Sequence, residues 1–364
     1  MTVRMKDIAK DLGVSIVTVS KVIRNHPDIA EETRERVLKR VRELDYQPNV
    51  LARSLVTGRS YLIGLVVPDL LHPFFCDVAK SLSTVIGKKG YSLIIAWSEE
   101  DPALEAREIL QLVGRQLDAL VIASSEVATD SFERLDRQGQ RYLLIDREFP
   151  ELSANFVGID DEAAGRIATE HLVDQGCKTI AHIRGPNVST GNRRLAGFQR
   201  ALTRRGLPYS DRYVLPGGSA DIGSHSHGAA AMRLLLDQTP IPDGVFCFND
   251  PLAIGAMNAI LEAGLRIPED VAVIGCGNLH YDGSLRVPLS SVDQNSQMIG
   301  EHAGNILLNL IESKNRPPPV KIVLDPELVV RASSKRDFGT KQGGLALITD
   351  ARPKQARAAR KQKS

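Results

Sequence analysis

The sequence predicts an α/β protein in which a small all-α N-terminal head precedes a core of doubly wound parallel sheets. Two observations support this. Apolar residues recur at helical spacing over residues 5–45. After Ser60, short runs rich in Val, Ile and Leu alternate with longer helical patterns, as expected for buried parallel strands joined by crossover helices. Residues 61–334 exceed what one compact core usually holds, so we expect two lobes with a cleft between them.

The head is expected to hold three short helices. They are Met5–Leu12, ended by Gly13; Ile16–Ile23, preceded by a Ser15 N-cap; and Ala30–Tyr46, ended by Pro48. A further short helix is expected between Asn49 and Val56. The predicted division is residues 1–47 for the head, 48–60 for a hinge helix and linker, 61–334 for the core and 335–364 for a basic disordered tail.

The core elements follow from the apolar runs and from the patterns between them. The expected strands are Leu62–Val67, Tyr91–Trp97, Ala119–Ala123, Arg141–Ile145, Phe156–Ile159, Thr179–Ile183, Gly244–Phe248, Val271–Ile274 and Ser290–Val292. The expected helices are Phe75–Lys89, Leu104–Arg115, Glu162–Gln175, Asn192–Arg205, Ala229–Leu236, Pro251–Ala263 and Gln297–Ser313. We assign residues 61–158 and 291–318 to lobe 1, and 159–290 and 319–334 to lobe 2.

The composition excludes several classes of protein. Of 364 residues, 43% are hydrophobic and 25% charged, which is typical of a soluble globular chain. No apolar run approaches the ~18 residues of a membrane helix, and the N-terminus lacks a secretory signal pattern. The four cysteines are scattered without a CxxC motif, which argues against a disulfide framework or a zinc site. We therefore expect a cytoplasmic protein.

Basic residues concentrate at the two ends of the chain. Residues 1–60 hold 12 Lys and Arg against 8 acids, and residues 335–364 hold 9 against 2. The middle is correspondingly acidic. This distribution indicates that one end meets a polyanion while the body does something else.

The segment Gly13-Val14-Ser15, between two amphipathic helices, is typical of a helix-turn-helix whose second helix enters the major groove of DNA. The hydroxyls of Ser15, Thr18 and Ser20 suit phosphate contacts near a helix N-terminus. An ordinary three-helix domain with a serine N-cap is the alternative.

The run MKDIAKDLGVSIVTVSKVIRN and the following EETRERVLKRVRELDYQPNVLARSL resemble the lactose-repressor (LacI) family of transcriptional regulators. The body shares landmarks of that family: IGLVVPD at 63–69, HPFF at 72–75, IDR at 145–147, GP at 185–186, NRRLAGFQRAL at 192–202, FCFND at 246–250, VIG at 273–275 and PELVVRASS at 326–334. The resemblance implies a repressor that binds a palindromic operator as a homodimer, with a core like the periplasmic sugar-binding proteins that holds a small-molecule effector, a sugar or sugar acid.

Carried over by position, the base-reading residues of the family fall on Ile16, Val17 and Lys21, and Asn25 joins the DNA-binding set. The two aliphatic side chains suit thymine methyl groups, and Lys21 suits guanine. Core packing is the alternative for Ile16 and Val17.

The resemblance places the second DNA element in the hinge helix, at Ala52, Arg53 and Leu55, with Leu55 as the minor-groove wedge. The alternative is an ordinary linker helix with one buried leucine.

The residues that bind the effector are expected beyond the carboxyl ends of strands, where open α/β sheets bind small molecules. The predicted set is His72, Phe74, Asp146, Thr190, Arg194, Asn249 and Asn278. Forked polar groups would bind hydroxyls, and Phe74 or Phe75 would stack on an apolar face. The alternative for Asp146 is an ion pair with Arg147 or another charge at the lobe boundary.

Gly277 stands where the family usually has an aspartate after the VIG strand, and Asn278 or His280 could substitute for it. The lost carboxylate shifts the expectation toward an anionic effector. The aromatic residue that often closes the pocket has no clear counterpart in GGSADIGSHSHGA. His225 and His227 lack an evident third ligand, so no metal is expected; no cofactor or enzymatic motif is found either.

Only Phe338, Leu345, Leu347 and Ile348 are large and apolar in the tail, which contains no leucine heptad, so a dimer rather than a tetramer is expected. A small-molecule binding or transport protein with an incidental basic head stays as the alternative from another class. A sugar-metabolising enzyme is a third, without motif support.

Overall fold

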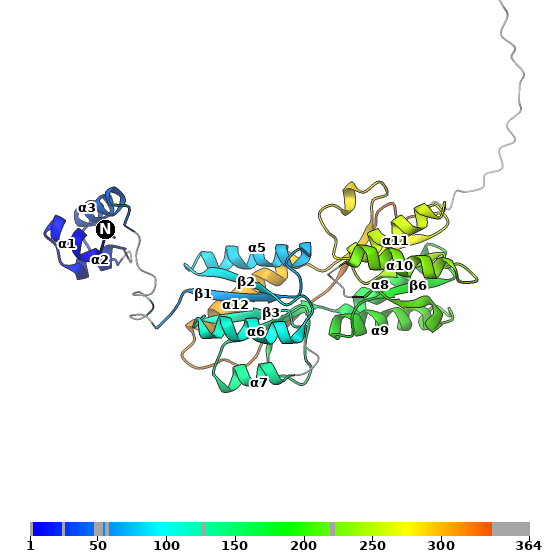
Figure 1. Cartoon of the computed structure of the whole chain (residues 1–364), viewed down its shortest axis with the longest axis horizontal. Helices are drawn as coiled ribbons and strands as arrows, with labels where there is room; N and C mark the ends of the chain where they lie inside the picture. The colour runs from blue at the N-terminus through cyan, green and yellow to red at the C-terminus, as the bar shows by residue number, and fades with distance from the viewer. Residues whose placement is uncertain are drawn as a thin grey trace, which may run out of the picture.

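Two six-stranded sheets and a three-helix head make up the computed structural model of the chain (Figure 1). It describes residues 3–23, 26–46, 54, 58–125, 129–218 and 223–336. The predicted sites Asn25, Ala52, Arg53 and Leu55 and the tail beyond residue 336 lie outside these ranges.

The head consists of α1 (Met5–Leu12), α2 (Ile16–Ile23) and α3 (Glu31–Glu43). Gly13 ends α1 at a φ of 66°, a left-handed conformation that glycine adopts without steric cost. The Oγ of Ser15 accepts a hydrogen bond from the backbone N–H of Thr18 at 3.0 Å, which is the expected N-cap of α2. Ile8, Val19, Val22 and Val37 form the buried centre of the three helices.

The first lobe is built on a parallel sheet of order β11-β5-β4-β3-β1-β2. Its strands are β1 (Leu62–Val67), β2 (Ser92–Trp97), β3 (Ala119–Ile122), β4 (Tyr142–Ile145), β5 (Asn155–Ile159) and β11 (Lys321–Leu324). Its helices are α5 (Pro73–Gly87), α6 (Pro102–Gly114), α7 (Asp130–Arg137) and α12 (Ser296–Glu312). Residues of α5 and α12 share one apolar cluster and those of α6 and α7 another, so the helices cover opposite faces of the sheet (Figure 1).

The second lobe has a sheet of order β12-β10-β9-β8-β6-β7, in which the pair β10–β12 is antiparallel. Its strands are β6 (Ile180–Arg184), β7 (Val214–Pro216), β8 (Gly244–Cys247), β9 (Ala272–Cys276), β10 (Ser290–Asp293) and β12 (Glu327–Val329). The helices α8 (Asp161–Asp174) and α9 (Ser189–Arg204) pack together, and α10 (Ser224–Leu236) packs with α11 (Asp250–Glu262). Short 3₁₀ turns lie at Asp211–Tyr213 and Asp282–Ser284.

The chain passes between the two sheets after β5, after β10 and after β11. The sequence-based lobe boundaries are wrong at the last two of these crossings. Ile322 of β11 pairs with Val157 in the first sheet, although residues 319–334 were expected in the second lobe. Ser291 of β10 pairs with Gly275 in the second sheet, although residues from 291 onward were expected in the first. Short strands of both sheets have the same apolar pattern, and only backbone pairing distinguishes them.

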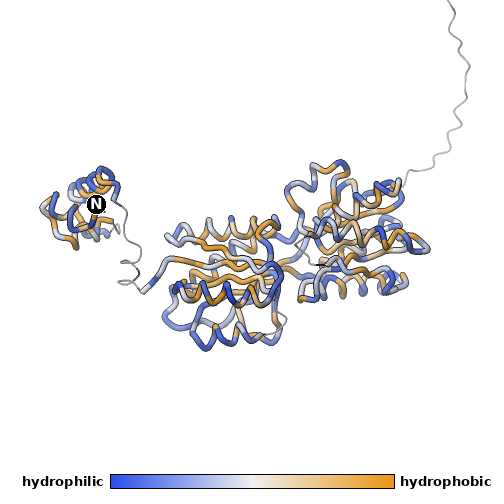
Figure 2. The backbone as a smooth tube through the Cα atoms, viewed as in Figure 1, coloured by the Kyte–Doolittle hydropathy of each residue, from blue (hydrophilic) through white to orange (hydrophobic). Residues whose placement is uncertain are grey.

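Apolar residues run along the strands, and polar residues cover the outer helix faces (Figure 2). The largest buried cluster contains Leu65 and Leu307 of the first lobe together with Phe198 and Ile274 of the second. The two lobes therefore share continuous apolar packing at their junction. None of the described helices is both long and apolar enough to span a bilayer.

Candidate functional site

The second helix of the head exposes two aliphatic side chains. Ile16 is 50% and Val17 61% exposed, whereas Val19 and Val22 on the opposite stripe are buried. The alternative that Ile16 and Val17 pack in the core is therefore wrong. Lys21, one turn after Val17, lies on the same face, because residues four apart on a helix are neighbours.

Ser15, Thr18 and Lys21, which the sequence assigns to DNA contacts, already have local partners. The Oγ of Ser15 lies 2.8 Å from Thr18 Oγ1 in addition to accepting the Thr18 N–H. Ser20 is half-buried on α2. The Nζ of Lys21 lies 2.5 Å from Asp28 Oδ2. Contact with DNA remains a prediction for all four residues.

The carboxyl ends of strands from both sheets meet at one cavity between the lobes. It is lined by His72, Phe74, Phe75, Asp146, Arg147, Arg194, Phe248, Asn249 and Gln294. Five of the seven predicted effector residues are thus brought together: His72, Phe74, Asp146, Arg194 and Asn249. The sequence analysis missed Phe248 and Gln294, and it named Arg147 only as a partner of Asp146. Each stands directly beside a predicted element, since Phe248 precedes Asn249 and Gln294 follows β10.

This cavity has a volume of about 20 Å³, enough for about one water molecule. A larger space of about 390 Å³ opens beside it, lined by residues of both lobes that include Arg147, Glu148, Ser189 and Arg193. Because Arg147 lines both spaces, they meet at this side chain. The site is therefore closed at its centre and adjoins larger open spaces at Arg147 and at His72, which also lines a depression of about 720 Å³.

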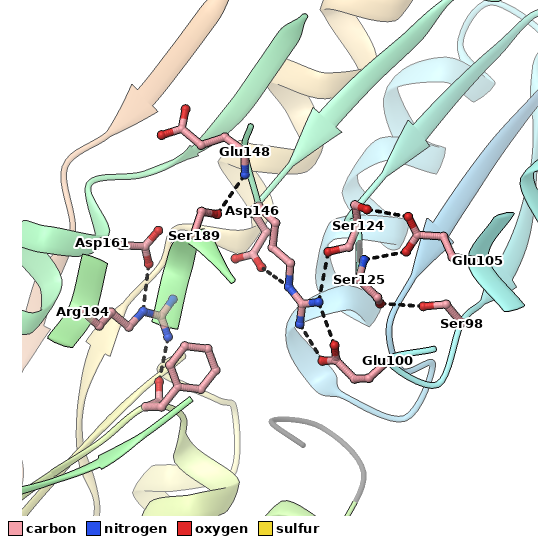
Figure 3. Close-up of polar contacts among 12 residues, drawn as sticks. Ser98, Glu100, Glu105, Ser124, Ser125, Asp146, Glu148, Asp161, Ser189 and Arg194 are labelled. Carbon is pink, nitrogen blue, oxygen red and sulfur yellow. Dashed lines mark hydrogen bonds and ion pairs between the residues drawn. The ribbon is translucent and has the colours of Figure 1, made fainter. Parts of the chain in front are cut away.

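Arg194 is held by its own lobe. Its Nε donates to Asp161 Oδ1 at 2.8 Å, its Nη1 donates to the carbonyl of Phe248 at 2.7 Å, and its guanidinium lies 4.5 Å from the centre of the Phe248 ring (Figure 3). Burial raises the pKa of Asp161 to about 6, against the opposing charge of Arg194. This ion pair lies in the interior, because the Arg194 side chain is 2% exposed.

Arg147 forms a corresponding ion pair in the first lobe, with Glu100. Its two terminal nitrogens donate to both oxygens of Glu100, at 2.9 and 2.6 Å, and Nη1 also donates to the carbonyl of Ser124 at 3.1 Å. Asp146 Oδ2 lies 3.8 Å from the Nε of Arg147, which is the ion pair considered as its alternative role. Both cavity arginines are therefore already neutralised.

A second buried carboxylate supports the same wall of the cleft. Glu105 accepts hydrogen bonds from Ser124 Oγ at 2.5 Å and from the Ser125 N–H at 2.6 Å (Figure 3). Ser125 Oγ in turn lies 2.9 Å from Ser98 Oγ. This network fixes the loops that follow β2 and β3, next to the carbonyl that receives Arg147.

Two titratable groups of the cavity are shifted toward their neutral forms. Burial raises the pKa of Asp146, while Arg147 and Arg194 oppose that shift. Burial also lowers the pKa of His72 to about 4, so this imidazole is neutral at physiological pH. Asp146 has a φ of 62°, which turns the chain sharply after β4.

Asn249 is the N-cap of α11, since its Oδ1 accepts the Leu252 N–H at 2.9 Å. Thr190 is buried near the start of α9 but does not line the cavity. Its placement in the effector set is therefore not supported by the cavity.

Asn278 does not line the cavity. Its hydrogen bonds instead connect its loop to β10 and to Arg331. Its backbone N–H donates to Ser291 Oγ at 2.9 Å, its Nδ2 donates to Asp293 Oδ2 at 2.9 Å, and its Oδ1 accepts from Arg331 at 2.6 Å. The expectation that Asn278 substitutes for the missing carboxylate in the cavity is wrong for this reason.

Gly277 has a backbone reason to lack a side chain. Its φ is 143°, and a Cβ there would lie 2.7 Å from Asp250 Oδ2. Asp250 is fixed in turn, because it accepts hydrogen bonds from Ser291 Oγ at 2.6 Å and from the Leu279 N–H at 3.2 Å. An aspartate at position 277 would therefore require Asp250 and its hydrogen-bond partners to move.

Within the described residues, no group of three or more His, Cys, Asp or Glu side chains is arranged to hold a metal ion. His225 and His227 lie on α10, and His225 Nε2 lies 3.1 Å from Asn258 Nδ2.

Comparisons with known proteins agree with this architecture. Residues 4–49 match the model of bacterial regulatory proteins of the lacI family, and residues 169–334 match a periplasmic binding protein-like domain. The HTH-type transcriptional repressor PurR of Haemophilus influenzae (strain PittEE) is 33% identical over 336 residues, which are 91% of this chain and 98% of that protein.

Two solved structures extend the comparison to the fold. The Lac repressor bound to ONPG in its repressed state superposes with a TM-score of 0.80 at 25% identity, covering 92% of this chain and 100% of that one. The complex of the transcriptional regulator CelR with cellobiose gives a TM-score of 0.69 at 29% identity, covering 91% and 99%. With a matching head, a matching core and a relative that spans nearly the whole chain, this protein belongs to the lacI family of bacterial regulatory proteins, which are DNA-binding transcriptional regulators and not enzymes.

Proposed function

We propose that this protein is a repressor that binds a palindromic operator as a homodimer, through α2 of each head, and that a small neutral sugar in the interlobe cavity controls it. The observation that carries the effector assignment is the cavity itself. Phe74, Phe75 and Phe248 supply apolar faces, while Arg147, Asn249 and Gln294 supply polar groups. Flat apolar faces beside forked donors and acceptors are what the two sides of a pyranose or furanose ring require.

The charge balance around the cavity favours a neutral effector over a sugar acid. Arg147 is paired with Glu100 and Arg194 with Asp161, and Asp146 adds a further carboxyl group. No positive charge is left over for an anion among these residues, whether or not Asp146 is protonated. This argument opposes the anionic effector that the loss of an acid at Gly277 suggested.

The small central volume supports control through movement of the lobes. A sugar is far larger than the single water that fits, so its entry requires the lobes to part or the lining side chains to move. Beside this cavity, Glu148 of the first lobe contacts the second lobe through an ion pair with Arg193 and through its backbone N–H, which donates to Ser189 Oγ at 3.0 Å. An effector that binds here would either break or strengthen these contacts. It would thereby shift the equilibrium between open and closed arrangements of the two lobes.

An exposed apolar surface that extends from Leu71 and Trp97 of the first lobe to Pro251 and Tyr281 of the second suits a second copy of the chain. Leu71 is 86% and Trp97 46% exposed, and both line a depression of about 720 Å³ together with Leu70 and Tyr281. Two heads are needed to read two half-sites of a palindrome, so a two-fold partner is expected somewhere on this core. We assign that partner to this surface, which we call the Leu71 surface. Action on chromosomal DNA would place the protein in the cytoplasm.

Selection of duplexes from a randomised library by the full-length protein tests DNA binding. We expect a palindrome whose half-sites are read by α2. Val17→Asp should abolish its binding, because it sets a negative charge against the DNA. Val17→Ala should keep binding and weaken the preference for thymine at one position. A protein that recovers no sequence would be the small-molecule binding protein considered above.

Thermal-shift screening with neutral sugars, sugar acids and purines as separate arms tests the effector class. A stabilising neutral sugar, confirmed by calorimetry, supports the proposal. Stabilisation by an acid or a purine alone would overturn the assignment and leave DNA binding untouched.

A further inference from the structure

The acidic residue Asp28 forms an ion pair with Lys21, the side chain of α2 that we expect to read guanine. The carboxylate of Asp28 lies 2.5 Å from Lys21 Nζ and, through its other oxygen, 2.6 Å from His26 Nδ1. The Lys21 and Asp28 side chains are 34% and 46% exposed. The hydrogen bond from Lys21 lowers the pKa of Asp28, so the carboxylate carries its charge at neutral pH.

This ion pair lies on the face that the proposed function assigns to DNA. Lys21 follows Val17 by four residues and so shares its exposed side of α2. A carboxylate there repels the phosphates of any duplex that approaches. The carboxylate of Asp28 also pairs with the Lys21 ammonium group, which would otherwise contact the phosphates. A second acid-to-base contact of the head, between Asp11 and Arg40 at 2.5 Å, joins α1 to α3 instead.

We propose that Asp28 is a specificity-determining residue, which restrains Lys21 on arbitrary DNA and releases it where a guanine edge accepts its N–H groups. The proposal rests on the proposed reading of DNA by α2. On a random sequence, Lys21 can reach a phosphate only by breaking its contact with Asp28. At the operator, the O6 and N7 acceptors of guanine replace that contact. A repulsive element of this kind raises the ratio of operator to non-specific affinity at some loss of total affinity.

The test compares full-length wild type with Asp28→Asn and with Asp11→Asn. Both variants remove one negative charge from the same head, but only the first acts on Lys21. The probes are a random-sequence duplex about three helical turns long and the palindrome that the wild type selects. Fluorescence titrations over a range of salt give the affinity and the number of phosphate contacts.

We expect Asp28→Asn to bind the random duplex about three- to tenfold more tightly, the range that an exposed ion pair and one added phosphate contact support. The slope of log Kd against log salt should steepen by about one contact. The palindrome should gain less, so the ratio of the two affinities falls. Asp28→Glu should restore that ratio, because it keeps the charge.

Three results would overturn the proposal. Equal gains for Asp28→Asn and Asp11→Asn would show a net-charge effect alone. Equal gains on both duplexes would show that Asp28 does not discriminate. Lost binding to both duplexes, with the head still folded by circular dichroism, would make Asp28 a direct DNA contact. If the wild type selects no palindrome, the proposed function fails by itself, and the random-duplex arm still decides whether Asp28 restrains Lys21.

Discussion

Arg194 and Asp161 form an ion pair inside the second lobe, with the Arg194 Nε 2.8 Å from Asp161 Oδ1 and side chains that are 2% and 5% exposed. The pair joins α9 to the start of α8. Arg194 also lines the interlobe cavity that we propose holds the effector, so one side chain serves both the stability of the lobe and the proposed site.

Arg194→Ala should therefore lower the free energy of unfolding by about 3–5 kcal/mol, because it leaves Asp161 buried without its partner. Effector affinity, measured by calorimetry on the folded fraction, should be lost as well. Arg200→Ala removes an arginine of the same helix from an exposed pair with Glu162 and should change little.

A double variant, Arg194→Met with Asp161→Asn, separates the two roles. Removing both charges should recover most of the melting temperature but none of the effector binding. If the double variant binds the effector normally, Arg194 does not belong to the site.

Stability should fall with rising pH because of Asp282. Burial, and then the negative charge of Asp250, raise the pKa of Asp282 well above its ordinary value near 4. The folded state therefore keeps a proton that the unfolded chain releases. The stabilising effect of this proton is complete below about pH 4 and is lost progressively as the pH rises above it, by up to about 1.4 kcal/mol per unit.

Asp282→Asn keeps a hydrogen-bond donor toward Asp250 without a titrating proton. Urea unfolding between pH 5 and 8 should give a flatter pH dependence for this variant than for the wild type. Asp146 and Asp161 also have raised pKa values and are common to both proteins, so they cancel in the difference, which reports the interacting pair Asp282 and Asp250. The exposed Asp237→Asn serves as the control. Parallel pH profiles for wild type and Asp282→Asn would contradict this assignment.

Leu71→Asp should convert a dimer into a monomer, because it sets a charge at the most exposed apolar side chain of the Leu71 surface. Light scattering should show half the wild-type mass, and operator affinity should fall. Trp97 is the single tryptophan of the chain, so its fluorescence should also change on dilution of the wild type.

Leu234→Asp is the matched change for that experiment, since Leu234 is 58% exposed on α10 and lies off the Leu71 surface. It should leave the mass unchanged. A dimer that survives Leu71→Asp would place the interface elsewhere, and a wild-type tetramer mass that does not depend on the tail would contradict the expected dimer.

Leu55→Ala should weaken operator binding and reduce bending of the DNA. The expected loss is on the order of a few kcal/mol, the scale of unstacking and bending a duplex at one base step. A circular-permutation shift assay measures both quantities. Unchanged affinity with an unchanged bend would remove Leu55 as a wedge and favour an ordinary linker.

The sequence by itself determined the helical head, the alternation of strands and helices, and much of the lining of the interlobe cavity. These features depend on neighbours a few residues apart. Gly13 and Ser15 end one helix and begin the next through local backbone geometry. Asp146 and Asn249 could be placed because polar residues after buried strands gather at one edge of a parallel sheet.

Only the tertiary structure decided how distant segments combine. β11 joins β5 although about 160 residues separate them, and no local pattern distinguishes one edge position from another. The same holds for the partners of the site. Glu100 neutralises Arg147, and Asp250 leaves no room for a side chain at Gly277. Asn278 is hydrogen-bonded to Arg331 instead of lining the cavity. Each of these depends on which charges and backbone atoms packing brings within a few ångströms, because electrostatic and steric energies follow distance in space rather than in sequence.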